Sequence, residues 1–164
     1  MKTAEGTPES AVAELPNGAR YFKCALHVNP FDYLARHGKA GAFADEATFN
    51  SAMVEALMGA GVQVVAVADH YRIGSSASLM DSASRAGLIV LPGFEAVAKD
   101  GVHLLCLFDP GTALARIDRV IGDCGVHDID ATSPQGDRYT EACLEEADDW
   151  ACIMVAAHVC SKGD

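Results

Sequence analysis

The sequence contains no long apolar run. No stretch approaches the roughly 18 apolar residues that a membrane-spanning helix needs, and residues 1–19 lack the apolar segment of a secretory signal. We therefore expect neither a membrane span nor a signal peptide. Residues 1–20, which include Gly6, Pro8 and Pro16, are predicted to form a disordered polar leader.

Basic residues are scarce. The chain has 12 Lys and Arg against 23 Asp and Glu, a net charge of −11. Such a charge repels nucleic acid and anionic membranes unless bound cations reverse the field locally. A phosphate-bearing substrate would therefore need a metal ion.

Paired cysteines are also absent. The six cysteines include no C-x-x-C pair, and several stand in apolar runs, where cysteine behaves as a small core residue. This pattern predicts reduced thiols in a cytoplasmic protein. Cys160 is an alternative case, since a thiolate two residues after His158 could be an adventitious zinc ligand.

What is present is the pattern of one α/β domain over residues 21–164. Apolar residues recur at helical spacing over 45–60, with Asp45 as the expected cap and Gly61 as the expected end. The β-branched run 62–68 predicts a strand buried on both faces, and the order around it predicts a parallel βαβ unit. Further strands are expected at 20–28, 88–97, 102–108 and 151–159, and further helices at 77–86, 112–121 and 139–149.

The strands 88–97 and 102–108 are too close in sequence for a parallel crossover, so they predict an antiparallel hairpin. With a three-residue loop and Gly101 in the left-handed conformation, Val97 pairs with His103. Glu95 and His103 then share one face of the sheet as diagonal neighbours, whereas a two-residue loop would put them on opposite faces. The final strand, 151–159, is expected to be apolar with an open edge, which predicts a marginal or homo-oligomeric protein.

Potential metal ligands follow one another at the ends of the predicted strands. They are His27, His70, Glu95, His103 and His158. A lone histidine in such a place is more often a structural hydrogen-bonding residue, but histidines combined with a carboxylate favour a metal site at the mouth of an α/β barrel. His127, Asp128 and Asp130 are instead interpreted as parts of a solvated loop.

Five short motifs carry a resemblance to a known family. They are Leu26-His27-Val28-Asn29, Ala68-Asp69-His70, Pro92-Gly93-Phe94-Glu95, Val102-His103-Leu104-Leu105 and Ala156-Ala157-His158. In this order they resemble the PHP (polymerase and histidinol phosphatase) family of metal-dependent phosphoesterases, and most of all the N-terminal PHP domain of TrlF-type ATPases. The resemblance implies a TIM-barrel-like, distorted (β/α)7 barrel that is incomplete here, with one β-hairpin and up to three divalent ions (zinc, manganese or iron).

Carried over by position, Glu95, His103 and His158 match the ligands of one ion, and Glu95 also bridges to a second. His27 matches a ligand of that second ion, although Asn29 stands where the family has another histidine. His70 matches a ligand of a third ion.

Two further acidic residues and one histidine are candidates near that third ion. Asp32 or His37 could add a ligand there, and Asp69 is expected to orient its neighbours rather than bind metal directly. The late Asp-x-His motif of the family is absent, so the C-terminal part of the barrel is expected to be missing or supplied by another chain.

Two functions remain open at this point. One is a phosphoesterase that hydrolyses a phosphate ester, for instance a nucleotide or a nucleic-acid end, with metal-activated water. The other is a degenerate PHP domain that serves as a scaffold or regulatory module for an associated ATPase. Asn29 and the missing motif favour this second function, whereas the complete set of Glu95, His103 and His158 favours the first.

Overall fold

The computed structural model describes residues 21–131 and 133–158. The predicted leader and Cys160 lie outside these residues. Its elements are β1 (Cys24–Val28), α2 (Phe31–Arg36), η1 (Ala40–Ala42), α3 (Glu46–Gly59), β2 (Val64–Val67), η2 (Gly74–Ser76), α4 (Ala77–Arg85), β3 (Ile89–Val97), β4 (His103–Phe108), α5 (Leu114–Asp123), α6 (Thr140–Glu145), α7 (Ala147–Trp150) and β5 (Cys152–Ala156). The chain is thus an α/β protein, as predicted.

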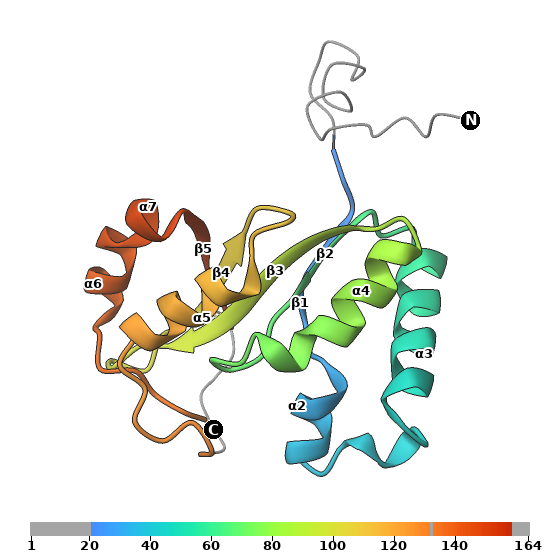
Figure 1. Cartoon of the computed structure of the whole chain (residues 1–164), viewed down its shortest axis with the longest axis horizontal. Helices are drawn as coiled ribbons and strands as arrows, with labels where there is room; N and C mark the ends of the chain where they lie inside the picture. The colour runs from blue at the N-terminus through green and yellow to red at the C-terminus, as the bar shows by residue number, and fades with distance from the viewer. Residues whose placement is uncertain (1–20, 132, 159–164) are drawn as a thin grey trace.

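The strands form one curled sheet in the order β1-β2-β3-β4-β5 (Figure 1). β1, β2 and β3 are parallel, and β4 and β5 continue the sheet in antiparallel fashion. The parallel pairs require crossovers, which α3 and α4 supply. Because β1, β2 and β3 are parallel neighbours, their carboxyl ends lie side by side at one end of the strands.

The side chains of the sheet divide into two apolar clusters. Val65, Phe94 and Phe108 belong to the larger cluster, which also contains buried residues of α3, α4 and α5. Alternate residues such as Ala66 and Leu105 belong to a smaller cluster made of strand residues and their immediate continuations. Because successive strand residues face opposite ways, helices cover one face of the sheet and the second cluster fills the inside of its curl.

The sequence predicted most of this architecture correctly. The 45–60 helix is α3, and the Asp45 carboxylate accepts a hydrogen bond from the amide of Thr48. The hairpin has the predicted register, with Val97 opposite His103, and φ of Gly101 is 83°.

Three expectations were wrong. The helix expected over 112–121 lies two residues later in the chain, since α5 begins at Leu114 after Ala113 and continues to Asp123. The helix expected over 139–149 is two short helices, α6 and α7, which meet at Glu146. The last strand is shorter than expected and only partly buried, because it has β4 as its one neighbour in the described sheet.

The described helices include none that is both long and apolar enough to cross a bilayer. The cysteines at 24, 106, 124, 143 and 152 are free thiols.

Candidate metal centre

The topology of the sheet brings the five predicted ligands to one edge. His27 lies near the end of β1, His70 just after β2, and Glu95 near the end of β3. β4 runs the opposite way, so its first residue, His103, reaches the same edge. β5 runs back again, and His158 follows its last residue by two positions.

Glu95 is the centre of this group, with an exposed fraction of only 2%. Its Oε2 lies 2.9 Å from Nε2 of His27 and 3.6 Å from Nε2 of His70. Its Oε1 lies 2.7 Å from Nδ1 of His103 and 3.4 Å from Nε2 of His158. Each carboxylate oxygen therefore faces two imidazole rings.

The surroundings keep Glu95 ionised. Burial alone would raise the pKa of this carboxyl, but the hydrogen bonds from His27 and His103 and the charge of His70 outweigh burial and lower it to about 2. For His70, burial lowers the pKa of the imidazole, although the nearby Glu95 acts in the opposite direction. An ionised carboxylate beside a neutral imidazole is the protonation state that metal ligation requires.

The backbone around His70 fixes its approach to Glu95. The amide of Glu95 donates to Asp69 O at 3.0 Å, and the amide of Tyr71 donates to Glu95 O at 3.3 Å, which extends the β2–β3 pairing through His70. Tyr71 has φ of 50°, a left-handed conformation rare for an aromatic residue. Its hydroxyl group donates to Val97 O at 2.7 Å and accepts from Val97 N at 2.8 Å, so this turn is held by tertiary contacts.

The donor atoms suit a transition-metal ion. They form two groups, His27–Glu95–His158 and His70–Glu95–His103, and within each group the ligand atoms lie within 4.8 Å of one another. Ligands about 2.1 Å from a tetrahedral ion are roughly 3.4 Å apart, close to the distances found around Glu95. Imidazole with carboxylate suits zinc, manganese or iron. The Nδ1 atom of His70 is buried without a hydrogen-bond partner among the described residues.

This grouping differs from the one that the resemblance implied. That His103 and His158 share one ion with Glu95 stays a prediction of the resemblance. The atoms that lie within 4.8 Å of one another here are those of Glu95 with His70 and His103, and those of Glu95 with His27 and His158. Glu95 belongs to both groups, as expected of a bridging carboxylate.

The other candidate ligands have different environments. Asn29 donates from Nδ2 to Ala68 O at 3.1 Å, so its amide ties β1 to the end of β2. Asp69 is bound by Arg36 through both carboxylate oxygens and belongs to neither group. Asp32 is exposed on α2, and the Nδ1 atom of His37 lies 2.8 Å from Tyr33 O.

His127, in the loop after α5, belongs to neither group of candidate ligands. His127 pairs with Asp137 on the surface, and Asp130 pairs with Arg72. The interpretation of this segment as a solvated loop agrees with the exposure of His127, Asp128 and Asp130.

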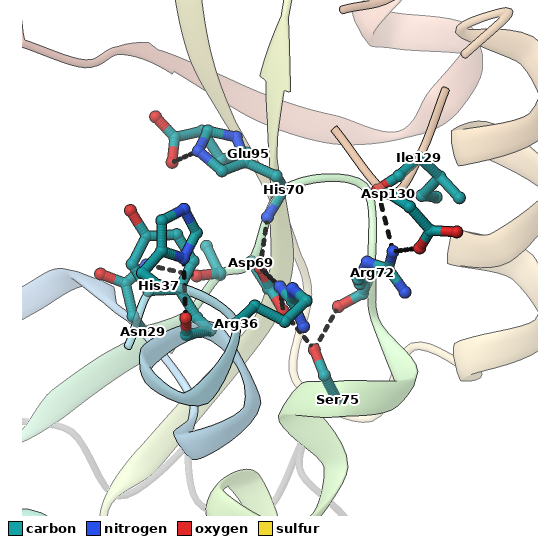
Figure 2. Close-up of polar contacts among 12 residues, drawn as sticks. Asn29, Arg36, His37, Asp69, His70, Arg72, Ser75, Glu95, Ile129 and Asp130 are labelled. Carbon is teal, nitrogen blue, oxygen red and sulfur yellow. Dashed lines mark hydrogen bonds and ion pairs between the residues drawn. The ribbon is translucent and has the colours of Figure 1, made fainter. Parts of the chain in front are cut away.

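A small cavity of about 60 Å³ adjoins His70. Arg36, His37 and Arg72 line it together with Ile129, Asp130, Ala131 and Pro134. Figure 2 shows Arg36, His37 and Arg72 around His70. Neither arginine was predicted from the sequence. Asp69 could have indicated an arginine at this place, because a carboxylate at the end of a buried strand needs a cationic partner.

Comparisons with known proteins add little to this geometry. No family model and no curated protein matches the chain. Of the solved structures, 8 chains match. One is a presumed metal-dependent phosphoesterase from Bifidobacterium adolescentis, 21% identical over 64% of this chain and 34% of that chain, with a TM-score of 0.40. Another is an amidohydrolase from Chromobacterium violaceum with bound sulfate and no metal, 19% identical over 77% of this chain and 36% of that chain, with a TM-score of 0.43. The chain thus spans about a third of the length of these two proteins.

Proposed function

We propose that this chain is a metal-dependent hydrolase and that its substrate is a phosphate ester. The observation that carries the proposal is the buried Glu95 carboxylate, whose two oxygens each face two imidazoles. A structural role would need only one or two of these contacts, because a single hydrogen bond per oxygen already satisfies a buried carboxylate. Four imidazoles from four segments of the chain are better explained as a ligand set.

The side chains of the site have separate tasks in this proposal. Lewis-acid polarisation of a phosphoryl oxygen and activation of a water molecule are what a divalent ion supplies in such a site. Glu95 with His27 and His158, and Glu95 with His70 and His103, would hold the ions. The lowered pKa of Glu95 keeps its negative charge available at neutral pH.

The neighbouring cavity supports an anionic substrate. Arg72 lines it, in a chain whose net charge is −11, and its partner Asp130 is 85% exposed, so an anion could replace that carboxylate. Guanidinium groups bind phosphate oxygens with two parallel hydrogen bonds. A neutral amide would gain little from this arginine, so the phosphoesterase activity is the finer proposal.

The resemblance to PHP domains adds further proposals. A complete barrel would need strands beyond the five described, from this protein or from another chain such as an ATPase. The competing possibility, a domain that keeps the fold without catalysis, gains one observation: the amide of Asn29 is engaged with Ala68 O rather than directed to the site.

Metal content tests whether the metal centre exists. We expect the protein, purified without chelators, to contain at least one zinc, manganese or iron ion per chain by plasma mass spectrometry. His103→Ala should lose metal, and His127→Ala, the same change at an exposed histidine, should not. An equal and negligible metal content in all three proteins would refute the metal centre.

Hydrolysis is then measured with p-nitrophenyl phosphate and bis-p-nitrophenyl phosphate after loading with each metal. Activity that disappears in Glu95→Gln supports the phosphoesterase. Metal that is bound without hydrolysis of either ester would favour the non-catalytic domain.

A further inference from the structure

The carboxylate of Asp69 is completely buried, with an exposed fraction of 0%. Its Oδ1 accepts a hydrogen bond from the amide of His70 at 2.8 Å, and its Oδ2 accepts one from the hydroxyl of Ser75 at 2.7 Å. Asp69 therefore braces the turn that follows β2 from both ends. His70 is the second residue of this turn.

Arg36 supplies the countercharge. Its Nη2 donates to Oδ1 and Oδ2 of Asp69 at 2.5 and 2.6 Å (Figure 2). Arg36 is the last residue of α2, the helix that follows β1 and His27. The pair thus joins the segment after one candidate ligand to the segment that carries another, over 33 residues of sequence.

The turn would not hold His70 in place without such support. The left-handed conformation of Tyr71 costs free energy, which other contacts must offset. The hydroxyl of Tyr71 fixes the turn on its far side, through Val97. Asp69 fixes the start of the turn, through its hydrogen bonds with the His70 amide and the Ser75 hydroxyl. A buried carboxylate stays in place only if its charge is compensated.

A second arginine in the same cavity has a different kind of partner. Arg72 donates to Asp130 at 2.5 Å and to Ile129 O at 2.8 Å, but Asp130 is 85% exposed. An exposed carboxylate can exchange its partner for water or for an incoming anion at little cost. Arg36 has no such freedom, because release would leave Asp69 buried and unpaired.

We infer that Arg36 is a positioning residue for the candidate metal centre, which acts through Asp69 to aim the imidazole of His70 at Glu95. The inference rests on the proposed function for its importance, but the positioning itself is a property of the protein without metal. Residues that orient a ligand from behind typically change metal affinity by roughly 10- to 100-fold when altered.

The test uses Arg36→Lys, which retains the charge but replaces the planar guanidinium, whose Nη2 donates to both oxygens of Asp69, with an ammonium group on a shorter side chain. In the metal-free protein, the side-chain nitrogen and proton signals of His70 in long-range ¹⁵N–¹H spectra should shift or broaden, and those of His127 should not. The affinity for zinc, measured by competition with a chromophoric chelator, should fall by roughly 10-fold or more. Arg85→Lys is the matched control, because Arg85 pairs with Asp81 on the surface of α4.

A second variant covers the case in which Arg36→Lys does not fold. Arg36→Gln combined with Asp69→Asn removes both charges and leaves no uncompensated ion. It should fold and show the same change at His70, since one amide oxygen cannot replace two carboxylate oxygens. Wild-type His70 signals and wild-type zinc affinity in a folded variant would overturn the inference. If the wild-type protein itself bound no zinc, the proposed function would fail while the spectra still decided the role of Arg36.

Discussion

Glu95 and His103 face each other across the β3–β4 hairpin, with Oε1 of Glu95 2.7 Å from Nδ1 of His103. They are not directly opposite, since Glu95 pairs with Leu105 and His103 with Val97. The contact is therefore a diagonal one on a single face of the sheet. It depends on a three-residue loop that ends in Gly101, because a shift of one residue would turn His103 to the other face.

Gly101→Val should weaken this hairpin. With φ of 83°, Gly101 occupies a conformation that a β-branched residue adopts only with strain. No neighbouring atom lies within 4 Å of the position of an added Cβ, so the cost is conformational and not steric. We expect the free energy of unfolding to fall by about 1–2 kcal/mol in urea denaturation.

Gly101→Asn is the control for this prediction, because asparagine tolerates the left-handed conformation better than valine. It should lose clearly less stability. Equal stability of the valine variant and the wild type would show that the loop does not need glycine.

The hairpin could be predicted from the sequence because its geometry follows from the number of residues between the two strands. Lys99, Asp100 and Gly101 leave no room for a crossover, and the period of two then places every side chain. The order of the candidate ligands at strand ends was predictable for the same reason. Local rules suffice where few residues separate the partners.

The partners of Asp69 could not be predicted in this way. Arg36 reaches Asp69 from the end of helix α2. A buried carboxylate indicates that some cation must pair with it, but the spacing does not indicate which one. The grouping of His158 with His27 likewise depends on the curl of the sheet, which brings together residues from β1 and from beyond β5. The division of 139–149 into α6 and α7 was missed because the apolar pattern alone does not show a break at Glu146.

Glu95 should make stability dependent on pH in the acid range. Its pKa is lowered from 4.5 to about 2, so the unfolded chain binds a proton below pH 4.5 that the folded protein does not take up until about pH 2. The stabilisation is complete above pH 4.5 and is lost as the pH falls through this window. The shift corresponds to about 3 kcal/mol. Urea denaturation with a chelator present should show the loss between pH 5 and pH 2.

Glu95→Gln should flatten this part of the stability profile, because glutamine does not titrate. Glu55→Gln, at an exposed position of α3, should keep the wild-type slope. The explanation would be wrong if Glu95→Gln and the wild type lost stability in parallel.

Gly93→Ala should destabilise the sheet by overpacking. A Cβ at this position would lie 2.7 Å from Cys106 O and 2.9 Å from Cδ2 of Leu107, on the neighbouring strand β4. The backbone oxygen cannot move without disturbing the β3–β4 pairing, so we expect a loss of about 1–3 kcal/mol in urea denaturation. Gly59→Ala, in α3 with no atom within 4 Å of the added group, should instead stabilise the protein by about 0.5–1 kcal/mol. Two losses of similar size would contradict the steric argument.

Ile153→Lys should reduce self-association. β5 pairs with β4 and has no other strand neighbour in the described sheet, and Ile153 on it is 68% exposed. An apolar residue on an unpaired edge promotes pairing with a second chain, which a lysine opposes. Light scattering should show the wild type gaining mass with concentration and Ile153→Lys staying smaller. Ile89→Lys is the control, because Ile89 is 44% exposed but lies at the start of β3, where it pairs with Val64 of β2; it should associate like the wild type. A wild type that stayed monomeric at every concentration would contradict the prediction that the edge of β5 drives association.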